Sequence, residues 1–156
     1  MKKSLIFLGA LLTFSSIALS QSISNIYVLS EEDSTSNKSC GISNETAIAA
    51  VKSALRYNRI SFSDSPVNSD FNLYINVNNF KVDSQSCSVN ASLQIYFYSR
   101  VPVPKTGKSL LLTSELCRKS TSGYLQIREM QNSINTALKG FVDECVLIIE
   151  EDLRKR

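Results

Sequence analysis

Strict alternation of apolar and polar residues begins at residue 71 and constrains the fold more than any other part of the sequence. The first run places apolar residues at every second position, at Phe71, Leu73, Ile75 and Val77. A second alternating run extends from Val89 to Phe97. Because successive side chains of a β-strand point to opposite faces, each run predicts a strand with one apolar and one polar face. The polar stretch 83–86 between the runs predicts a β-hairpin.

The two apolar faces match in one simple register, which predicts the residues that lie opposite each other. Its pairs are Leu73 with Phe97, Ile75 with Ile95 and Val77 with Leu93 on the apolar face, and Tyr74 with Tyr96 and Asn76 with Gln94 on the polar face. After residue 78 the apolar positions change phase and continue at Phe80 and Val82. A change of phase inside a strand predicts a β-bulge near residues 78–79.

Helical periodicity flanks the strands on both sides. Residues 44–57 carry their apolar side chains on one helical face, with Ser43 or the residue after it as the N-cap. The helical period returns after the strands, where an apolar stripe consists of Ile127, Met130, Ile134, Leu138, Phe141, Cys145, Ile148 and Ile149. This stripe predicts a long second helix, with Gly140 as the point at which it could bend. Residues 109–118 are expected to form a third strand before it.

The remaining segments are shorter and more polar. An apolar run at residues 26–29 predicts a short edge strand, residues 30–42 are expected to be a mobile loop, and residues 61–70 a connecting loop. The main elements therefore follow the order helix, three strands, helix. We expect a single α+β domain over residues 43–156, preceded by an N-terminal segment over residues 21–42. Its antiparallel meander sheet is covered on one face by the two helices, while the other face meets water.

Residues 1–20 have the composition of a signal peptide. Two lysines precede an apolar segment at residues 5–14, and the Ala-Leu-Ser sequence at residues 18–20 provides small residues at a cleavage site. The apolar segment is shorter than the roughly 20 residues that a membrane-spanning helix needs. We therefore expect cleavage before Gln21, a periplasmic or secreted protein, and no stable membrane insertion.

The cysteines predict disulfide bonds. An even number of them, Cys40, Cys87, Cys117 and Cys145, in an oxidising compartment favours two disulfides. A metal site is not expected, because the chain has no histidine and no closely spaced cysteine pair. The expected strand ends bring Cys87 closest to Cys117, but Cys145 then lies roughly 30 Å along a straight helix from Cys40. A break near Gly140, a different topology or a free Cys145 remain as alternatives.

The expected exported chain is nearly neutral. Its 17 basic side chains fall to 15 without the two lysines of the signal peptide, against 14 acidic ones, so the net charge is about +1. Nucleic-acid binding requires a clustered basic face and is not expected. No cofactor is expected either, because the sequence Gly-Lys-Ser at residues 107–109 lacks the first glycine of a phosphate-binding loop.

The absence of histidine closes two common routes to catalysis. Ser-His and Cys-His nucleophiles both need an imidazole base, and the chain contains none. A small hydrolase of cell-wall or polysaccharide substrates, acting through paired carboxylates, is the alternative function. Its candidate side chains are Asp64, Asp70, Asp83 and Glu115. Their spacing does not predict a catalytic pair, so no catalytic residue is assigned.

The polar face of the predicted hairpin is the candidate binding site. Its residues are Tyr74, Asn76, Asn78, Gln94, Tyr96 and Tyr98. Tyrosine combines apolar area with a hydrogen-bonding hydroxyl, and amides both donate and accept hydrogen bonds. This mixture suits the surface of a protein or a polysaccharide. We therefore expect an exported non-enzymatic binding protein, an adaptor or an inhibitor of an envelope or extracellular enzyme, whose partner is a protein or polysaccharide of the cell envelope.

Overall fold

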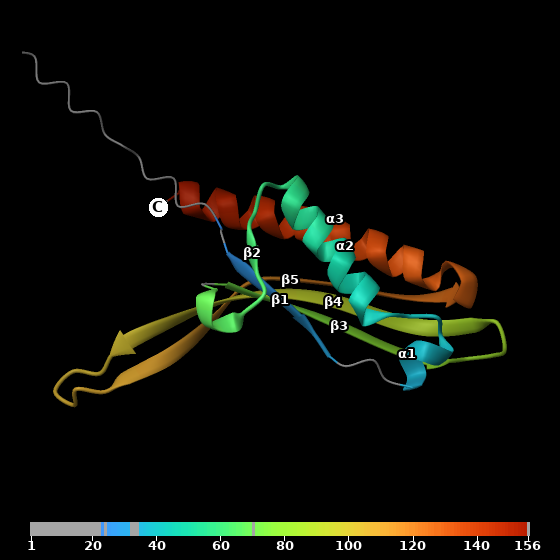
Figure 1. Ribbon diagram of the computed structural model, residues 1–156, viewed down its shortest axis with the longest axis horizontal. Helices are drawn as coiled ribbons and strands as arrows, with labels where there is room; N and C mark the ends of the chain where they lie inside the picture. The colour runs from blue at the N-terminus through green and yellow to red at the C-terminus, as the bar shows by residue number, and fades with distance from the viewer. Residues whose placement is uncertain (1–22, 24, 32–34, 70, 156) are drawn as a thin grey trace, which may run out of the picture.

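Two long helices lie side by side on one face of a five-stranded sheet in the computed structural model, which describes residues 23, 25–31, 35–69 and 71–155 (Figure 1). Along the chain the elements are β1 (Ile26–Ser30), α1 (Thr35–Ser39), α2 (Asn44–Tyr57), β2 (Phe62–Ser63), the 3₁₀ turn η1 (Pro66–Asn68), β3 (Phe71–Lys81), β4 (Ser86–Pro102), β5 (Ser109–Gln126) and α3 (Ile127–Arg154). In the sheet the strands follow the order β2-β1-β3-β4-β5. The fold is a single α+β domain, as the periodicities predict.

The sheet is mixed, which corrects the expectation of a purely antiparallel meander. Strands β3, β4 and β5 form the expected antiparallel part, but β1 pairs in parallel with both β2 and β3. The run at residues 26–29 is therefore an internal strand, and the two-residue strand β2 lies at the edge beside it. The reason is the connection through α2, because parallel strands can be joined only by a crossover of this kind. Ile26 and Val28 of β1 are buried in the core beneath it.

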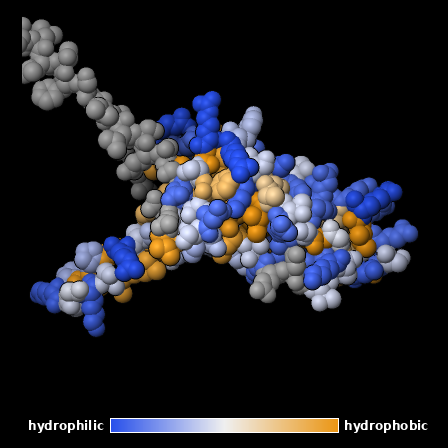
Figure 2. All heavy atoms as spheres, viewed as in Figure 1, coloured by the Kyte–Doolittle hydropathy of each residue, from blue (hydrophilic) through white to orange (hydrophobic). Residues whose placement is uncertain are grey.

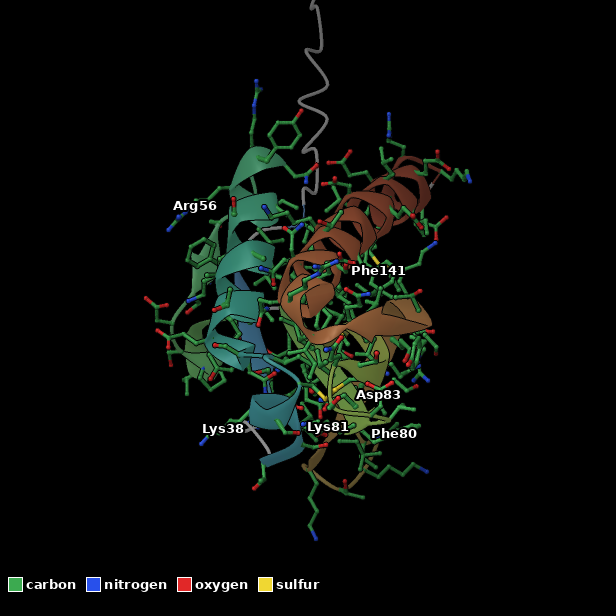
Figure 3. The ribbon with its side chains drawn as sticks, turned by 90° about the vertical axis from the view of Figure 1, so that its right-hand side faces the viewer. Lys38, Arg56, Phe80, Lys81, Asp83 and Phe141 are labelled. Atoms are coloured by element: carbon green, nitrogen blue, oxygen red, sulfur yellow. A yellow bond between two sulfur atoms is a disulfide. The ribbon has the colours of Figure 1, made fainter. Side chains whose placement is uncertain are left out.

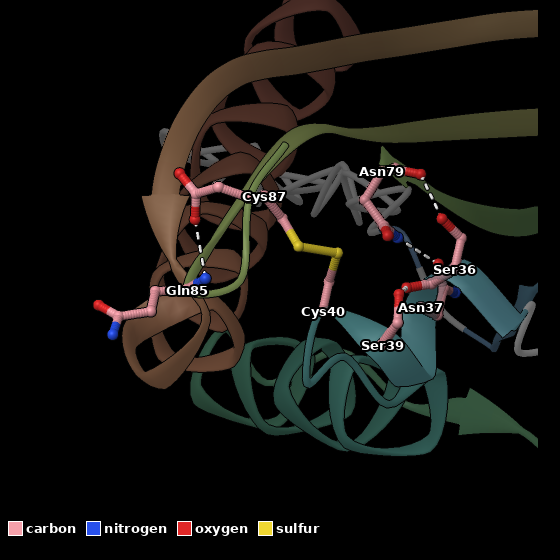
Figure 4. The surroundings of a disulfide bond; sticks show 8 residues. Ser36, Asn37, Ser39, Cys40, Asn79, Gln85 and Cys87 are labelled. Carbon is pink, nitrogen blue, oxygen red and sulfur yellow. Dashed lines mark hydrogen bonds between the residues drawn. A yellow bond between two sulfur atoms is a disulfide. The ribbon is translucent and has the colours of Figure 1, made fainter. Parts of the chain in front are cut away.

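Helix α1 lies within residues 30–42, which corrects the expectation of a mobile loop there. The Ser36 hydroxyl donates a hydrogen bond to the Asn79 carbonyl of β3 at 2.7 Å, and the Asn79 amide donates to the side-chain oxygen of Asn37 (Figure 4). A disulfide between Cys40 and Cys87 attaches the end of α1 to β4. This polar segment is ordered because its side chains pair with a strand, a contact that local composition does not reveal.

The bulge predicted at residues 78–79 is absent, because β3 pairs with β4 without interruption from Phe71 to Lys81. Asn79 lies on the helix side of β3, where its amide N–H donates to Asn37 of α1. The strand therefore keeps its phase, and Phe80 falls on the exposed side. A register shift occurs instead between β4 and β5, after Ile95.

The hairpin register differs from the predicted one by two residues. The observed pairs include Leu73 with Ile95, Ile75 with Leu93, Val77 with Ala91, Tyr74 with Gln94 and Asn76 with Ser92. Because the shift is even, the two alternating runs, residues 71–77 and 89–97, keep their predicted faces. The cause is a tighter turn, in which the Asp83 carboxylate accepts the Gln85 N–H at 2.8 Å and Ser86 already belongs to β4. This backbone hydrogen bond, with a second one from the Tyr124 hydroxyl, lowers the pKa of Asp83.

Helices α2 and α3 form where the helical period predicts them and pack against each other (Figure 3). The Ser43 hydroxyl caps α2 by accepting the Thr46 N–H at 3.2 Å. Helix α3 is continuous through Gly140. Between helices and sheet lies the core, whose largest fully buried side chains include Ile26, Val51, Leu55, Leu73, Ile75, Leu93, Ile95, Met130, Leu138 and Val142.

Strand β5 runs on to Gln126, well beyond the predicted end at residue 118. Residues 120–123, which lie beyond that predicted end, pair with β4. Strand β4 offers backbone N–H and C=O groups as far as Ser86. Because β5 can pair with these groups, it continues to Gln126, which lies opposite Ser86. Its serine and threonine side chains are tolerated there because they stay exposed to water.

The disulfides join Cys40 to Cys87 and Cys117 to Cys145, so the predicted pair of Cys87 with Cys117 is wrong. Because β5 is long, Cys117 lies within the strand and not at its end. From Cys117 to Gln126 the strand advances roughly 30 Å, at about 3.3 Å per residue. Helix α3 then returns by roughly 27 Å to Cys145, at about 1.5 Å per residue. The two cysteines therefore meet, and a straight helix is compatible with the bond.

Candidate functional site: the polar face of the sheet

The polar face lies on the side of the sheet opposite the helices. It consists of Tyr74, Asn76 and Asn78 from β3 and Gln94, Tyr96 and Tyr98 from β4. These residues alternate with buried core residues of the same strands, such as Ile75 and Ile95. Period-two geometry therefore places all six on one face. The structure brings together the residues that the sequence predicts as a binding site, and their role in binding stays a prediction.

A carboxylate that the sequence analysis did not assign to the site organises one half of this face. Glu31 follows β1, and its Oε1 accepts hydrogen bonds from the Tyr74 hydroxyl and, at 3.2 Å, from the Asn76 amide. The Asn76 side-chain oxygen in turn accepts the Asn78 amide at 2.7 Å. Sequence reasoning misses Glu31 because it lies in a charged run beside a polar segment. The signal that finds it is the parallel register, in which Leu29 lies beside Tyr74.

The backbone of Glu31 is held by a hydrogen bond from helix α2. Asn44, the first residue of α2, donates its side-chain amide to the Glu31 carbonyl at 2.6 Å. Asn44 is buried, and its side-chain oxygen accepts a hydrogen bond from Asn37 at 3.4 Å. The start of α2 therefore fixes the backbone of Glu31, and the Glu31 carboxylate fixes the side chains of β3.

The other half of the face combines an aromatic ring with a charged pair. The Tyr96 hydroxyl donates to the Gln94 side-chain oxygen. On the neighbouring strand β5, Arg118 lies opposite Gln94 and Glu115 opposite Tyr96. The Arg118 guanidinium forms two hydrogen bonds with Glu115 Oε2, at 2.6 and 3.0 Å, and this contact raises the pKa of Arg118. The polar face therefore continues onto β5 with Arg118, which the sequence analysis did not single out, and Glu115, which it named only for the alternative hydrolase.

The carboxylate of Glu31 changes the acidity of its tyrosine partner. The hydrogen bond from Tyr74 to Glu31 raises the pKa of Tyr74 to about 12, with further contributions from partial burial and from the negative charge of Glu31. The neutral phenol is favoured because it donates this hydrogen bond, whereas a phenolate would repel the carboxylate.

This shift predicts a distinct alkaline titration. Of the six tyrosines, we expect one to ionise near pH 12 when absorbance at 295 nm is followed, and the Tyr74→Phe variant to lack that step. Because the folded-state pKa is raised, the contribution of Tyr74 to stability is complete below about pH 10 and is lost as the pH rises toward 12. An unchanged titration curve for Tyr74→Phe would show that the Glu31 contact does not form in solution.

The acidic residues that are candidates for the alternative hydrolase function lie in different parts of the fold. Asp64 follows β2 and pairs with Lys52 at 3.0 Å, Asp83 forms the β3–β4 turn, and Glu115 pairs with Arg118 on β5. From the level of Glu115 to that of Asp83 the sheet extends roughly 30 Å, and β2 and β5 are separated by roughly 19 Å across the strands. Both spans exceed the separation of about 5 to 9.5 Å in glycosidase pairs. Asp70 lies outside the described residues.

Two further findings concern the part of the chain that the structure describes. No group of three or more acidic or cysteine side chains is placed there to hold a metal ion. None of the described helices has the length and apolarity needed to span a bilayer. Two disulfides are typical of proteins that work in an oxidising compartment outside the cytoplasm. The signal peptide expected at residues 1–20 lies outside the described residues.

Comparison with known proteins gives distant structural similarity only. No family model and no curated protein sequence matches the chain. The PelC dodecamer from Paraburkholderia phytofirmans is similar with 8% identity over 83% of this chain and 90% of that chain, at a TM-score of 0.40. The hypothetical protein CT253 from Chlamydia trachomatis is similar with 7% identity over 86% of this chain and 100% of that chain, at a TM-score of 0.43. These similarities are too distant to assign this chain to a family or a function.

Proposed function

We propose that this chain is an exported, non-enzymatic binding protein that recognises a protein or polysaccharide of the cell envelope through its polar face. The observation that carries the proposal is the hydrogen-bonded group formed by Glu31, Tyr74, Asn76 and Asn78 on a sheet face without helices. Hydrogen bonds between the side chain that follows β1 and those of β3 hold this face in one arrangement before any partner binds.

Such preorganisation supports binding because ordering side chains costs free energy on association. Immobilising a flexible side chain costs roughly 0.5–1.5 kcal/mol, and here the Glu31 contacts already restrict Tyr74 and Asn76. Tyrosine adds large contact area with few rotatable bonds. The polar face can therefore offer both apolar area and oriented hydrogen-bonding groups to a partner.

Of the two partner classes, the composition of the surface favours a protein. Tyrosine and arginine are enriched at protein–protein interfaces, and Arg118 on β5 lies opposite Gln94, two residues from Tyr96. An adaptor, or an inhibitor that covers the active site of an envelope or extracellular enzyme, acts through a surface of this type. A polysaccharide is the alternative that the experiment below must separate.

The test is a pull-down from the envelope fraction with the disulfide-bonded chain as bait, followed by affinity measurement with the purified partner and, separately, with envelope polysaccharide. We expect Tyr74→Ala and Tyr96→Ala each to weaken binding by at least about 1 kcal/mol, roughly fivefold in Kd, if they are central to the interface. Tyr57→Ala is the matched control, because Tyr57 lies at the end of α2 and is 84% exposed.

Three results distinguish the outcomes. Weaker binding of both polar-face variants, which remain folded under the assay conditions, with unchanged binding of Tyr57→Ala, supports the proposal. Equal affinity of all three variants for the captured partner means that the polar face is a bystander. Binding of polysaccharide alone, with the same dependence on Tyr74 and Tyr96, keeps the site and replaces the partner class.

A further inference from the structure

The hairpin that joins β4 to β5 extends beyond the rest of the sheet as a free arm. We define the arm as residues 99–113, and Figure 1 shows it projecting away from the helical layer. At its tip the Val103 N–H donates to the Lys108 carbonyl at 2.9 Å, and the Thr106 hydroxyl donates to the Val103 carbonyl at 3.1 Å. The tip is thus a defined turn that holds the two strands of the arm together.

One face of the arm is apolar and uncovered. Val101 lies directly opposite Leu110, and Leu112 follows two residues later on the same face. Leu110 is 58% and Leu112 46% exposed. Figure 2 shows hydrophobic atoms along the stem of the arm and hydrophilic atoms at its tip. Lys108, two residues before Leu110, places a cation at the end of this face. We call Val101, Lys108, Leu110 and Leu112 the arm face.

The charge of the arm has a single sign. Residues 84–114 contain no aspartate or glutamate, and the cations of the arm are Arg100, Lys105 and Lys108. A covering partner must therefore offer apolar side chains next to negative charge.

Helix α3 presents such a surface near its C-terminal end. Leu147 and Ile148 are 58% and 40% exposed, although they belong to a helix whose other apolar residues are mostly buried. Glu151 and Asp152 follow at helical spacing, and their side chains are 64% and 66% exposed. Both carboxylates reach Lys155 only at 3.9 Å. We call Leu147, Ile148, Glu151 and Asp152 the α3 stripe.

We propose that the arm of one copy of this chain packs on the α3 stripe of a second copy. Leucine and valine of the arm face cover Leu147 and Ile148, and Lys105 and Lys108 approach Glu151 and Asp152. Packing of one arm against the arm of another copy is less favourable, because their cations would repel each other. The arm face lies on the helix side of the sheet, so this association leaves the polar face free and does not depend on the proposed function.

The arm face and the α3 stripe are different surfaces, so variants of the two can be tested for complementation. The mass of each sample is measured by light scattering on a size-exclusion column, at chain concentrations of roughly 10–200 μM. One variant carries Leu110→Ser and Leu112→Ser, and the other Leu147→Ser and Ile148→Ser. We expect the unaltered chain to run above the mass of one copy and each variant alone to run as a monomer. Their equimolar mixture regains association, because each variant keeps the surface that the other has lost. Val67→Ser is the matched control, because Val67 is 88% exposed on η1.

A charge exchange extends the test. Lys105→Glu with Lys108→Glu, and Glu151→Lys with Asp152→Lys, are each expected to self-associate at least tenfold more weakly than the unaltered chain, whereas their mixture regains association because each new charge then meets its opposite. An unaltered chain that stays monomeric at all concentrations overturns the proposal, as does self-association of the α3 variant alone, which would mean arm-to-arm pairing. Failure of the two serine variants to complement each other also overturns it. A monomer that cosediments with phosphatidylglycerol vesicles through Leu110 and Leu112 would make lipid the occupant instead.

Discussion

Replacing Cys40 and Cys87 together by alanine is expected to lower the free energy of unfolding by about 4 kcal/mol, and replacing Cys117 and Cys145 by about 3.5 kcal/mol. The sequence separations of 47 and 28 residues give these values when a disulfide acts by restricting the unfolded chain. Alanine is the better replacement because all four sulfurs lie in the core, where a serine hydroxyl would be buried. Urea unfolding of each double variant measures the loss.

The two disulfides make different contributions to the site, which allows a further distinction. Cys40 follows α1, which lies near the start of α2 and so near Asn44 and Glu31. Removing the Cys40–Cys87 bond is expected to disturb the hydrogen bond from Tyr74 to Glu31, whereas removing the Cys117–Cys145 bond is not. The alkaline titration of Tyr74 reports this difference. Peptide mapping under non-reducing conditions that recovers Cys87 linked to Cys117 would contradict the described connectivity.

Local periodicity predicts the elements of this fold well because each long element buries one face. Helix α2, helix α3 and the β3–β4 hairpin all follow from the spacing of apolar residues, and the two alternating runs of the hairpin keep their predicted faces, whereas Phe80 does not. The features that the sequence predicts wrongly are those that depend on contacts between residues distant in the sequence. The parallel position of β1, the length of β5 and the disulfide connectivity all depend on which edges and levels meet in space.

The candidate site likewise contains residues that local periodicity predicts and residues that only contacts distant in sequence bring to it. Its six predicted residues share one face because period two determines which side of a strand a residue occupies. Glu31 and Arg118 join them only through the register of β1 and β5 with their neighbours. A short polar segment such as α1 shows no signal of its own, because its order comes from the amide pair with Asn79 and from the Cys40 disulfide.

Ile75→Ala and Ile95→Ala are each expected to lower the free energy of unfolding by about 2–5 kcal/mol. Both side chains are almost completely buried between sheet and helices, so truncation leaves a cavity that neighbouring strands cannot close. For a chain of this size the melting temperature should fall by roughly 4–20 °C. Differential scanning calorimetry of the oxidised protein measures both quantities.

The matched control is Gln94→Ala, which removes a side chain of similar length from the position next to Ile95 in the sequence. Gln94 lies on the polar face, where water can replace its hydrogen bond with Tyr96, so we expect a change below about 1 kcal/mol. Comparing the stabilities of Gln94→Ala and Ile95→Ala therefore tests which face of β4 is buried, with two positions that are adjacent in the sequence. If Gln94→Ala destabilises the fold as much as Ile95→Ala, the polar face is covered in the native protein, and it is then part of the core and no longer available as a binding surface.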